Sequence, residues 1–501
     1  MGIRALIARP YASMVTSAVM RRALEPVATQ GRVLAKLLEK GRSTAFGRDH
    51  RLVQVEDHQG LVEAIPLRDY EGSRPYLDRV AKGEADVLWP GMPLYLCKTS
   101  GTTSGAKYIP ITRDSLPNHL DSARRALLAY IDHTGRAAFT EGKMIFLQGS
   151  PVLDRNGAIP TGRLSGIVAN HVPSYLLKNR LPSFATNSIG DWSTKVDAIV
   201  EETRHEDLRL ISGIPAWVQM YFERLLERTG KETVAQVFPN FSLFVYGGVN
   251  FEPYRGRMRT LIGGDIPSVE LFPASEGFIA YQDKGPEEGL LLVLDNGIYY
   301  GFIPQGGHHQ HRVLSIEDVE LDVNYALVLY TNAGLWGYEI GDTVRFVSLS
   351  PPRIVVTGRT KHFTSAFGEH VIAEEVEGAM VDALREQAAE VAEFTVAPLL
   401  APADGGVARH EWFIEFAMAP ADIPAFEQEL DRSLQRRNPY YRDLITGSVL
   451  RPLKVVRVRR GGFQEWMRGR GMNDAQSKVP RLANDRRFVE GLEPLVHSTD
   501  L

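Results

Sequence analysis

Residues 99–107, TSGTTSGAK, combine the residue types that are best suited to binding a phosphate group. Gly101 and Gly105 let the backbone turn tightly and approach a ligand closely. Successive backbone N–H groups in such a turn form a concave anion site, to which five Ser and Thr hydroxyls add donors. Lys107 supplies a positive point charge. The stretch therefore predicts a phosphate-binding loop, and a surface hairpin rich in Gly and Ser is the alternative.

This loop differs from the phosphate loop of P-loop NTPases, which reads GxxxxGK[ST] and opens a helix. Here three residues separate the two glycines, Ala106 precedes Lys107, and Tyr108 follows it. The apolar, β-branched and aromatic residues at 93–97 and 108–112 are typical of strands. We therefore expect a strand, a loop and a second strand in place of a kinase-type loop.

Two carboxylates lie in short polar segments that follow apolar runs, Glu276 within PASEG and Asp342 within YEIGDT. Glu276 suits Mg²⁺, because magnesium binds few carboxylates together with phosphate oxygens of a substrate. An ordinary turn with a solvated Glu is the alternative. Asp342 offers acceptor oxygens that suit a ribose diol, although an Asp between two strands is most often a turn former.

Three further groups of basic residues are candidates for binding a nucleotide, a metal or RNA. Lys478, within AQSKVPR, acts on a nucleotide only if a C-terminal domain closes over it, and otherwise it is a solvated lysine. The histidines at 308, 309 and 311 have no Cys or carboxylate partner at ligand spacing, so we interpret them as part of a solvated loop. A basic run is interpreted as a solvated face rather than an RNA site; it consists of Arg457, Arg459, Arg460, Arg468 and Arg470.

The elements that must position these residues follow from periodicity. Residues 16–40 have helical spacing of apolar side chains, with a break or kink expected at Pro26 and at Gly31 and an end at Gly41. A looser region follows, up to the glycine-rich loop. From 144 to 304 strands and helices alternate, which predicts βαβ units and a largely parallel sheet. Ligands of such sheets bind beyond the carboxyl ends of the strands, where Gly247, Gly248 and the turn at 274–277 are expected.

The pattern changes near Gly358. A second tier of strands runs from about 290 to 361, and after it helices and strands mix in an α+β pattern. We therefore predict an α/β protein with a large N-terminal domain, residues 1–357, whose mixed and parallel sheets are flanked by helices. A smaller α+β domain, residues 358–501, follows. A chain of 501 residues is longer than one hydrophobic core usually supports.

Composition excludes several classes of protein. The chain has 44% hydrophobic and 24% charged residues and a net charge of −4, so no basic excess favours nucleic acid. Cys97 has no second cysteine to pair with, which indicates a reducing compartment. No apolar run reaches the ~18 residues of a membrane span, and residues 1–20 make a poor signal peptide. We expect a cytoplasmic enzyme with no membrane partner; the oligomeric state is not readable.

The order of these motifs resembles the adenylate-forming superfamily of acyl-CoA synthetases, peptide-synthetase adenylation domains and luciferases. More narrowly, the chain resembles the auxin-responsive acyl acid–amido synthetase family in a bacterial-type form. The matching segments span most of the chain: TAFGRDH at 44–50, the loop at 99–107 with Ile109-Pro110, YGG at 246–248, YYGFIP at 299–304, GYEIGD at 337–342 and QSKVPR at 476–481.

The resemblance implies a two-step ligase that uses ATP and Mg²⁺. A carboxylic acid becomes an acyl-adenylate, and an amino acid or another amine then attacks the activated carbonyl. It places Glu276 on Mg²⁺ and makes Lys107 and Lys478 the catalytic cations, with Lys478 carried by a mobile C-terminal domain. The residues that it assigns to the nucleotide and carboxylate are Ser100, Gly101, Thr102, Thr103, Ser104, Gly105, Gly247, Gly248, Ala274, Ser275, Asp342 and Arg359.

The chain departs from the family pattern at three places. Phe272-Pro273 stands where the family has a Tyr, Glu339-Ile340 where it often has Arg, and Ser477 where an aromatic residue often precedes the lysine. A non-catalytic nucleotide-binding relative is therefore an alternative. An acyl-CoA ligase of the same superfamily is another, because a thiol acceptor would leave the first step unchanged. The acid and the acceptor are not readable from the sequence.

Overall fold

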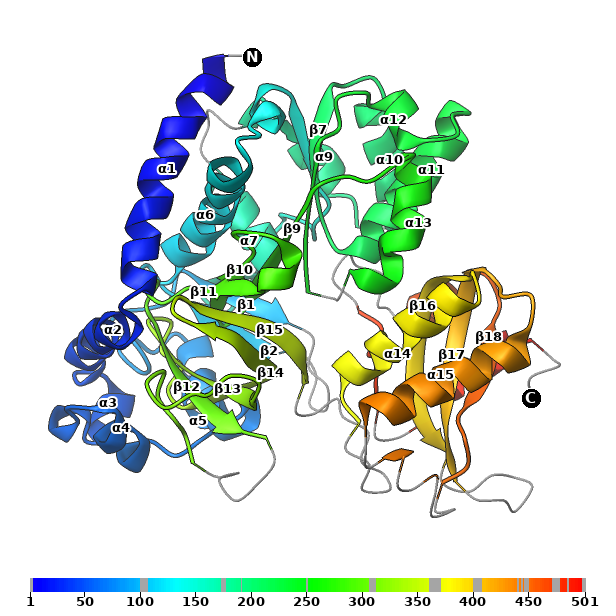
Figure 1. Cartoon of the computed structure of the whole chain (residues 1–501). Coiled ribbons are helices and arrows are strands. Elements are labelled where there is room, and N and C mark those ends of the chain that lie inside the picture. Colours follow the sequence, from blue (N-terminus) through cyan, green and yellow to red (C-terminus); the bar gives the residue numbers. More distant parts are fainter. Residues whose placement is uncertain are drawn as a thin grey trace. The chain divides into compact units, whose positions relative to one another are not determined.

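The computed structural model describes most of the chain (Figure 1). The described residues are 3–99, 107–172, 177–190, 192–248, 251–305, 312–359, 371–399, 408–438, 441–442, 445, 450–470, 478–483 and 486–497. The histidines at 308, 309 and 311 and residues 100–105 of the predicted phosphate loop lie outside them.

Two helices open the chain, α1 (Ile3–Ala23) and α2 (Pro26–Gly41). Pro26 is the first residue of α2, where its missing N–H costs no hydrogen bond. The expected break at Pro26 and the end at Gly41 are confirmed. The expected break at Gly31 is wrong, because α2 continues through it. Helix α1 packs along α6 (Leu116–Thr134), as Figure 1 shows.

The region that we expected to be loose contains three short helices, α3 (Ala45–Asp49), α4 (His58–Ala64) and α5 (Tyr70–Ala81). Each begins with a capping side chain that accepts a hydrogen bond from the backbone N–H of a glycine three residues later. The pairs are Thr44 with Gly47, Asp57 with Gly60, and Asp69 with Gly72. Such a cap satisfies an N–H group that the first turn leaves unpaired, so the recurrent spacing was a readable signal.

The largest sheet has 11 strands in the order β12-β13-β14-β15-β11-β10-β9-β8-β7-β3-β6. Its parallel part consists of β3 (Lys143–Phe146), β6 (Arg180–Leu181), β7 (Leu208–Ser212), β8 (Leu243–Gly247) and β9 (Ser268–Ala274). Along the chain α10 (Trp192–Thr203), α11 (Pro215–Thr229) and α13 (Glu252–Ile262) connect these strands. The predicted βαβ units are confirmed, because parallel neighbours need such crossovers.

The remaining strands of this sheet form its antiparallel part. They are β10 (Gly277–Tyr281), β11 (Leu290–Leu292), β12 (Ile298–Pro304), β13 (Asn324–Thr331), β14 (Tyr338–Leu349) and β15 (Pro352–Arg359). Antiparallel pairs form between β9 and β10, β10 and β11, β11 and β15, β12 and β13, and β13 and β14. The sheet is therefore mixed, as the sequence predicted.

A second sheet has four strands in the order β2-β1-β5-β4. Its strands are β1 (Tyr95–Thr99), β2 (Lys107–Ile111), β4 (Asp154–Asn156) and β5 (Ile159–Gly162). Strands β1 and β2 are antiparallel, and Thr99 lies opposite Lys107. The strands predicted on each side of the glycine-rich loop are therefore confirmed.

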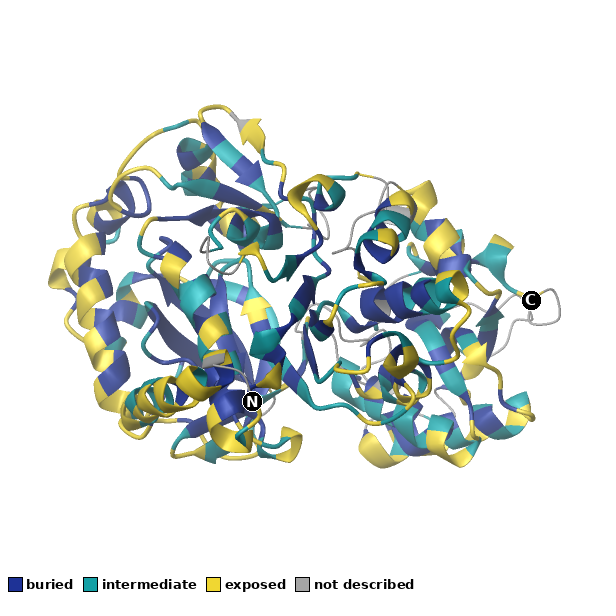
Figure 2. Cartoon of the chain, turned by 90° about the horizontal axis from the view of Figure 1, so that it is seen from above, coloured by how far each residue is buried: buried dark blue, intermediate teal, exposed yellow. Residues whose placement is uncertain are grey.

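Apolar side chains from both sheets fill the interior. One cluster joins α2 and the short helices to the β1–β2 hairpin and to one face of β12–β14. Another lies on the opposite face of the antiparallel strands, and a third places α1 and α6 against β7–β11. Figure 2 shows the buried residues on the central strands and the exposed residues on the outer helices. The β1–β2 hairpin and strands β8 and β9 thus rest on a close-packed apolar interior.

The C-terminal residues form a three-stranded sheet, β16 (Glu390–Leu399), β17 (Arg409–Met418) and β18 (Lys454–Val458). Helices α14 (Ala373–Glu386) and α15 (Ile423–Arg437) pack on each other, and α17 (Gly462–Gly469) follows β18. The short elements of the chain are η1 (Leu52–Gln54), η2 (Ala138–Glu141), α7 (Leu164–Ala169), α9 (Phe184–Asn187), α12 (Val234–Val237), η3 (Pro286–Glu288), η4 (Val489–Gly491) and η5 (Glu493–Leu495).

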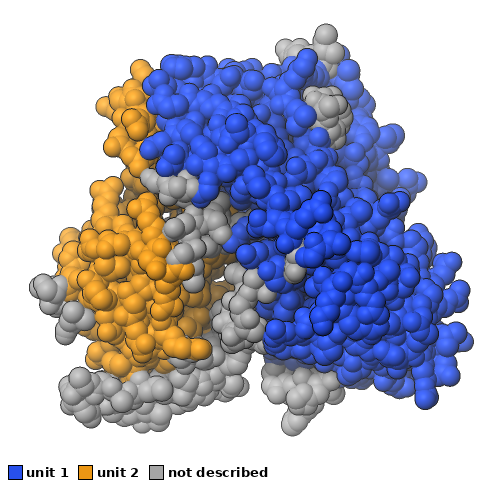
Figure 3. Space-filling view, turned by 180° about the vertical axis from the view of Figure 1, so that it is seen from behind, with its two compact units in different colours: residues 1–213, 238–248, 266–356 blue, residues 214–237, 249–265, 357–501 orange. Residues whose placement is uncertain are grey.

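The chain divides into two compact units, coloured in Figure 3. Unit 1 comprises residues 1–213, 238–248 and 266–356, and unit 2 comprises 214–237, 249–265 and 357–501. Helices α11, α12 and α13 therefore belong to unit 2, although they precede its C-terminal sheet by more than a hundred residues. The division into domains at 1–357 and 358–501 is a different grouping and stays a prediction.

Among the described helices, none combines the length and the apolar character that crossing a membrane requires.

Candidate active site

The β1–β2 hairpin holds Lys107 at the base of the predicted phosphate loop. The Lys107 Nζ lies 5.7 Å from the centroid of the Tyr70 ring, within the range of a cation–π contact. The Tyr70 hydroxyl accepts a hydrogen bond from the Tyr108 backbone N–H at 3.0 Å. Helix α5 thereby fixes the strand that carries Lys107. The six predicted phosphate ligands at 100–105 lie outside the described residues.

Strand β8 ends at Gly247, and Gly248 follows it. Gly247 pairs with Leu271 of the parallel neighbour β9, and a Cβ atom added to Gly247 would overlap the Leu271 carbonyl oxygen. Gly248 has a φ of +83°, a conformation that glycine adopts readily. The backbone itself forms the surface at this point, which is the edge where ligands bind in parallel sheets.

The turn between β9 and β10 carries Ser275 and Glu276. Ala274 pairs with Gly277, so these two residues form a two-residue hairpin turn. Both are half-buried. Because β9 pairs with β8, the turn lies on the strand adjacent to Gly247. The structure therefore brings Gly247, Ala274, Ser275 and Glu276 to one part of the sheet.

Cys97 connects this turn with the β1–β2 hairpin. Burial raises the pKa of the Cys97 thiol to about 12, with a hydrogen bond to Ser275 and the charges of Glu276 and Arg163 as smaller influences. The thiol is therefore neutral at physiological pH. Cys97 lies in β1, two residues before the end of that strand at Thr99. The sequence carried no signal for this contact, because its two partners are separated by more than 170 residues.

Asp342 lies inside strand β14, in a bulge. Val328 pairs with Glu339 and Ala326 pairs with Thr343, so residues 340–342 lie opposite Leu327 alone. Gly341 has a φ of +86° within this bulge. The turn expected between two strands at Asp342 is therefore wrong, because strand pairing continues on both sides of it. Bulges redirect side chains and are frequent beside active sites, and Asp342 is half-buried.

Arg68 ties the start of β14 to the TAFGRDH segment. Its backbone bridges that strand, with Arg68 N–H donating to the Gly337 carbonyl at 2.9 Å and its carbonyl accepting from Glu339 N–H at 2.8 Å. Its guanidinium lies 2.7 Å from His50 Nε2. Phe46 stacks on His50 and on Trp336, with ring centroids 4.0 and 5.9 Å apart. Arg68 and these rings thus link the TAFGRDH segment to the start of the strand that carries Asp342.

Lys478 belongs to unit 2. It is exposed, and the next residue, Val479, is buried. The Pro480 carbonyl accepts a hydrogen bond from the Thr395 hydroxyl at 2.6 Å, so the chain after Lys478 lies against β16. Arg359 is the last residue of β15, and its side chain lies outside the described part of the protein.

No group of three or more His, Cys, Asp or Glu side chains in the described part of the chain could hold a metal ion.

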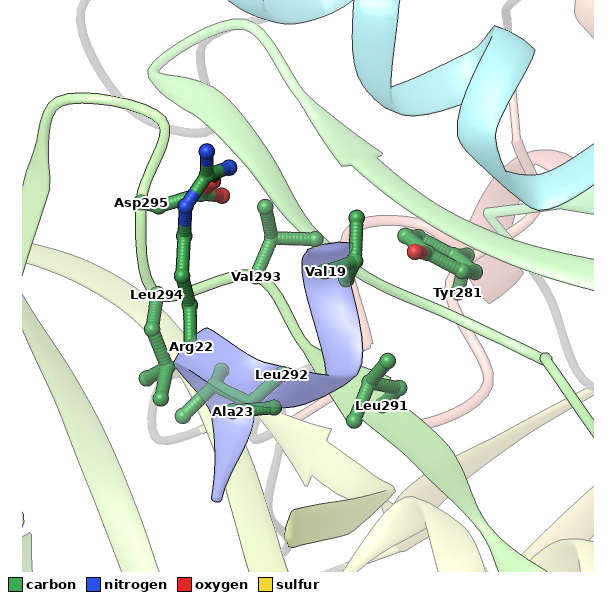
Figure 4. Close-up of a pocket in the computed structure, with 9 residues that line it drawn as sticks. All are labelled: Val19, Arg22, Ala23, Tyr281, Leu291, Leu292, Val293, Leu294 and Asp295. Atoms are coloured by element: carbon green, nitrogen blue, oxygen red, sulfur yellow. Dashed lines mark hydrogen bonds and ion pairs between the residues drawn. The ribbon is translucent and has the colours of Figure 1, made fainter. Parts of the chain in front are cut away.

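A small pocket lies between α1 and the strands β10 and β11, and Figure 4 shows its lining. Its volume of about 10 Å³ is close to the least that admits one water molecule. In it Arg22 and Asp295 form an ion pair of 2.6 Å. The lining residues are Val19, Arg22, Ala23, Tyr281, Leu291, Leu292, Val293, Leu294 and Asp295. None of them belongs to the candidate site, and no substrate fits here.

The fold defined by these sheets is that of the adenylate-forming ligases. The solved structure of GH3.15 acyl acid amido synthetase matches with a TM-score of 0.80 at 17% identity, covering 96% of each chain. The solved 2-hydroxyisobutyryl-CoA ligase in its postadenylation state matches with a TM-score of 0.61 at 12% identity, covering 94% of this chain and 91% of the other. The predicted fold class is confirmed.

The chain belongs to the GH3 family. It matches the family's N-terminal domain over residues 19–191, its central domain over 291–359 and its C-terminal domain over 374–487. It is 22% identical over 558 residues to the indole-3-acetic acid-amido synthetase GH3.3 of Arabidopsis thaliana, covering 94% of this chain and 91% of that protein. The resemblance seen in the sequence is thereby confirmed.

Proposed function

We propose that this protein is an ATP-dependent ligase that converts a carboxylic acid to an acyl-adenylate and then joins it to an amine, with an amino acid as the expected acceptor. The observation that carries the proposal is the convergence of Gly247, Ser275 and Glu276 at the strand ends of the parallel sheet, beside the hairpin of Lys107. The names of its GH3 relatives, which are amido synthetases, support an amine acceptor.

The two steps overcome the poor reactivity of a carboxylate. In the first step a carboxylate oxygen attacks the α-phosphorus of ATP, and pyrophosphate leaves. In the second step the amine nitrogen attacks the acyl carbonyl carbon, AMP leaves, and the nitrogen loses a proton. AMP is a far better leaving group than the oxide that a free carboxylate would have to expel. The protein must therefore bind and orient a nucleotide and an acid together.

The roles of individual residues are part of the same proposal. Residues 100–105 hold the ATP phosphates with Lys107 as a supporting charge. Asp342 accepts hydrogen bonds from the ribose hydroxyls, and Arg359 contacts the nucleotide. The open backbone at Gly247 and Gly248, with Ala274 and Ser275, lines the AMP and carboxylate side. Lys478 stabilises the negative charge that develops in the first step, an effect often worth a large share of catalysis.

Glu276 is the residue that we assign to the magnesium ion. It is half-buried in the two-residue turn between β9 and β10. When bound, Mg²⁺ supplies positive charge to the phosphate oxygens of ATP. The cytoplasmic location expected from the single cysteine also belongs to this proposal.

Product analysis tests the proposed acceptor. Purified protein is incubated with ATP, Mg²⁺, a panel of aryl, indolyl and aliphatic acids, and either the twenty amino acids or CoA, and the products are identified by mass spectrometry. The proposal expects an amide of one acid with an amino acid. A thioester with CoA and no amide would replace it with an acyl-CoA ligase, and ATP binding without any product would indicate a non-catalytic relative.

A further inference from the structure

Arg481 is a buried cation three residues after Lys478. Its side chain is 9% exposed. The guanidinium donates to Glu393, to the Phe394 carbonyl at 2.8 Å and to the Tyr254 hydroxyl at 2.6 Å. Its Nε lies 3.4 Å from Glu377, an ion-pair distance. Its central carbon lies 4.4 Å from the centroid of the Phe394 ring.

The backbone around Arg481 is bound to β16 as well. The Arg481 carbonyl accepts from Val396 N–H, and Ala483 N–H donates to the Val396 carbonyl, both at 3.0 Å. Together with the Thr395–Pro480 hydrogen bond these contacts extend the C-terminal sheet by a short bridge. The chain that leads away from Lys478 is thus fixed, while Lys478 itself is exposed.

Tyr254 brings a second element to this point. It is buried in α13, and its hydroxyl donates to Glu393 at 3.2 Å while it accepts from Arg481. Burial raises the pKa of Tyr254 far above its usual range, so the hydroxyl keeps the proton that this pattern requires. Helix α13 begins four residues after Gly248 along the chain. Arg481 therefore joins the lysine segment to the helix that follows the glycine turn.

We propose that Arg481 is a positioning residue for Lys478: its contacts with Glu377, Glu393 and Tyr254 fix the short segment from which the lysine reaches the reacting phosphate. This role rests on the proposed function. A lysine side chain has four flexible carbons, so its reach is reproducible only if its backbone is held. Displacing a catalytic group by about 1 Å costs on the order of 10²-fold in rate.

Arg481→Lys separates positioning from charge. The variant keeps a cation beside the two carboxylates, but an ammonium cannot reproduce the planar fork or the stacking on Phe394. Tyr254→Phe removes one hydroxyl and keeps the ring. The matched controls are Arg486→Lys and Tyr441→Phe. Arg486 donates to Glu411 and Glu493 at 2.9 and 3.2 Å and lies 5.9 Å from the Phe413 ring, and the buried Tyr441 donates to Asp431 at 2.7 Å.

The experiment measures ATP–pyrophosphate exchange and backbone hydrogen exchange on each full-length variant. We expect Arg481→Lys to lower the kcat of exchange by about 10²-fold with little change in the KM for ATP, and Tyr254→Phe to lower it by about tenfold. The amides of Val396 and Ala483 exchange faster in Arg481→Lys. Both controls keep the wild-type kcat and the protection of these two amides.

Two results would overturn the positioning role. One is a wild-type kcat in Arg481→Lys although the Val396 and Ala483 amides have lost protection. The other is an equal fall in Arg481→Lys and Arg486→Lys, which indicates general destabilisation. Absence of exchange in the wild type with every acid would instead overturn the proposed function, and the positioning role with it.

Discussion

Gly247→Ala is the smallest change that tests how the strand ends build the site. Gly247 closes β8 beside β9, and the added methyl group would overlap the Leu271 carbonyl oxygen. It would also lie 3.3 Å from the Leu271 carbonyl carbon and 3.3 Å from Pro273 Cδ. A backbone carbonyl cannot rotate away as a side chain can, so β9 must shift. The turn with Ser275 and Glu276 shifts with it.

Two opposing effects set the change in the free energy of unfolding for Gly247→Ala. Overpacking a close-packed interior costs about 1–3 kcal/mol. Replacing Gly by Ala also reduces the conformational entropy of the unfolded chain, which raises the free energy of unfolding by about 0.4–1 kcal/mol. We expect a net loss of about 1–2 kcal/mol in the free energy of unfolding. The matched control is Gly31→Ala in α2, where a methyl group meets nothing within 4 Å and should stabilise the helix by about 0.5–1 kcal/mol.

Urea unfolding followed by circular dichroism gives the stability difference, and pyrophosphate exchange gives the effect on the site. We expect Gly247→Ala to unfold at lower urea concentration and to exchange pyrophosphate more slowly, whereas Gly31→Ala gains stability and keeps its rate. If Gly247→Ala gained stability as Gly31→Ala does, the close approach of β8 and β9 would be refuted.

Four further predictions concern charged residues. Lys478→Ala should lower adenylation by about 10²–10³-fold with ATP binding retained in calorimetry; unchanged adenylation would remove Lys478 from the site. Glu276→Gln should raise the Mg²⁺ concentration that gives half-maximal exchange, and an unaltered magnesium titration would contradict its role. Asp283 forms a bidentate ion pair with Arg353, and their side chains are only 3% and 5% exposed. Asp283→Asn should therefore lower the free energy of unfolding in urea by about 3–5 kcal/mol. A loss below about 1 kcal/mol would show that the pair is solvated. Burial lowers the pKa of Lys195 to about 8 from its ordinary 10.5. Between pH 8 and 10.5 the unfolded chain binds more protons than the folded protein, so the free energy of unfolding should rise with pH. Lys195→Met should remove that rise in urea unfolding.

The sequence predicted the elements whose signals are local. The strands at β7, β8 and β9 have apolar runs flanked by polar or glycine-rich turns, and the helices between them have clear periodicity. The glycine-rich loop was placed between two strands because the residues after it are β-branched and aromatic. These features depend on neighbours within about ten residues, so they are visible without the fold.

The features that were missed depend on partners far along the chain. An Asp between two strands favours a turn at Asp342, but pairing of β14 with β13 continues on both sides of it through a bulge. Cys97 contacts Ser275 because two different sheets meet, which periodicity does not show. The three short helices at 45–81 lack the length for a clear apolar period, and only their caps at Thr44, Asp57 and Asp69 announced them.

Arg481 shows the same limit within a motif that the sequence did identify. The QSKVPR segment directed attention to Lys478, while the role of its arginine depends on Tyr254, Glu377 and Glu393. Along the chain, Glu393 lies 88 residues from Arg481 and Tyr254 lies 227 residues from it. A motif therefore marks a segment of interest, and the fold decides which of its residues act directly and which hold the others in place.

The central claim, formation of an acyl-adenylate, is tested most directly by the exchange of labelled pyrophosphate into ATP. Wild-type protein is assayed with Mg²⁺ against aryl, indolyl and aliphatic carboxylic acids, with Lys478→Ala as the control. We predict exchange that requires both Mg²⁺ and one class of acid, and that Lys478→Ala loses. Binding of ATP by the wild type without exchange in the presence of any acid would contradict the account.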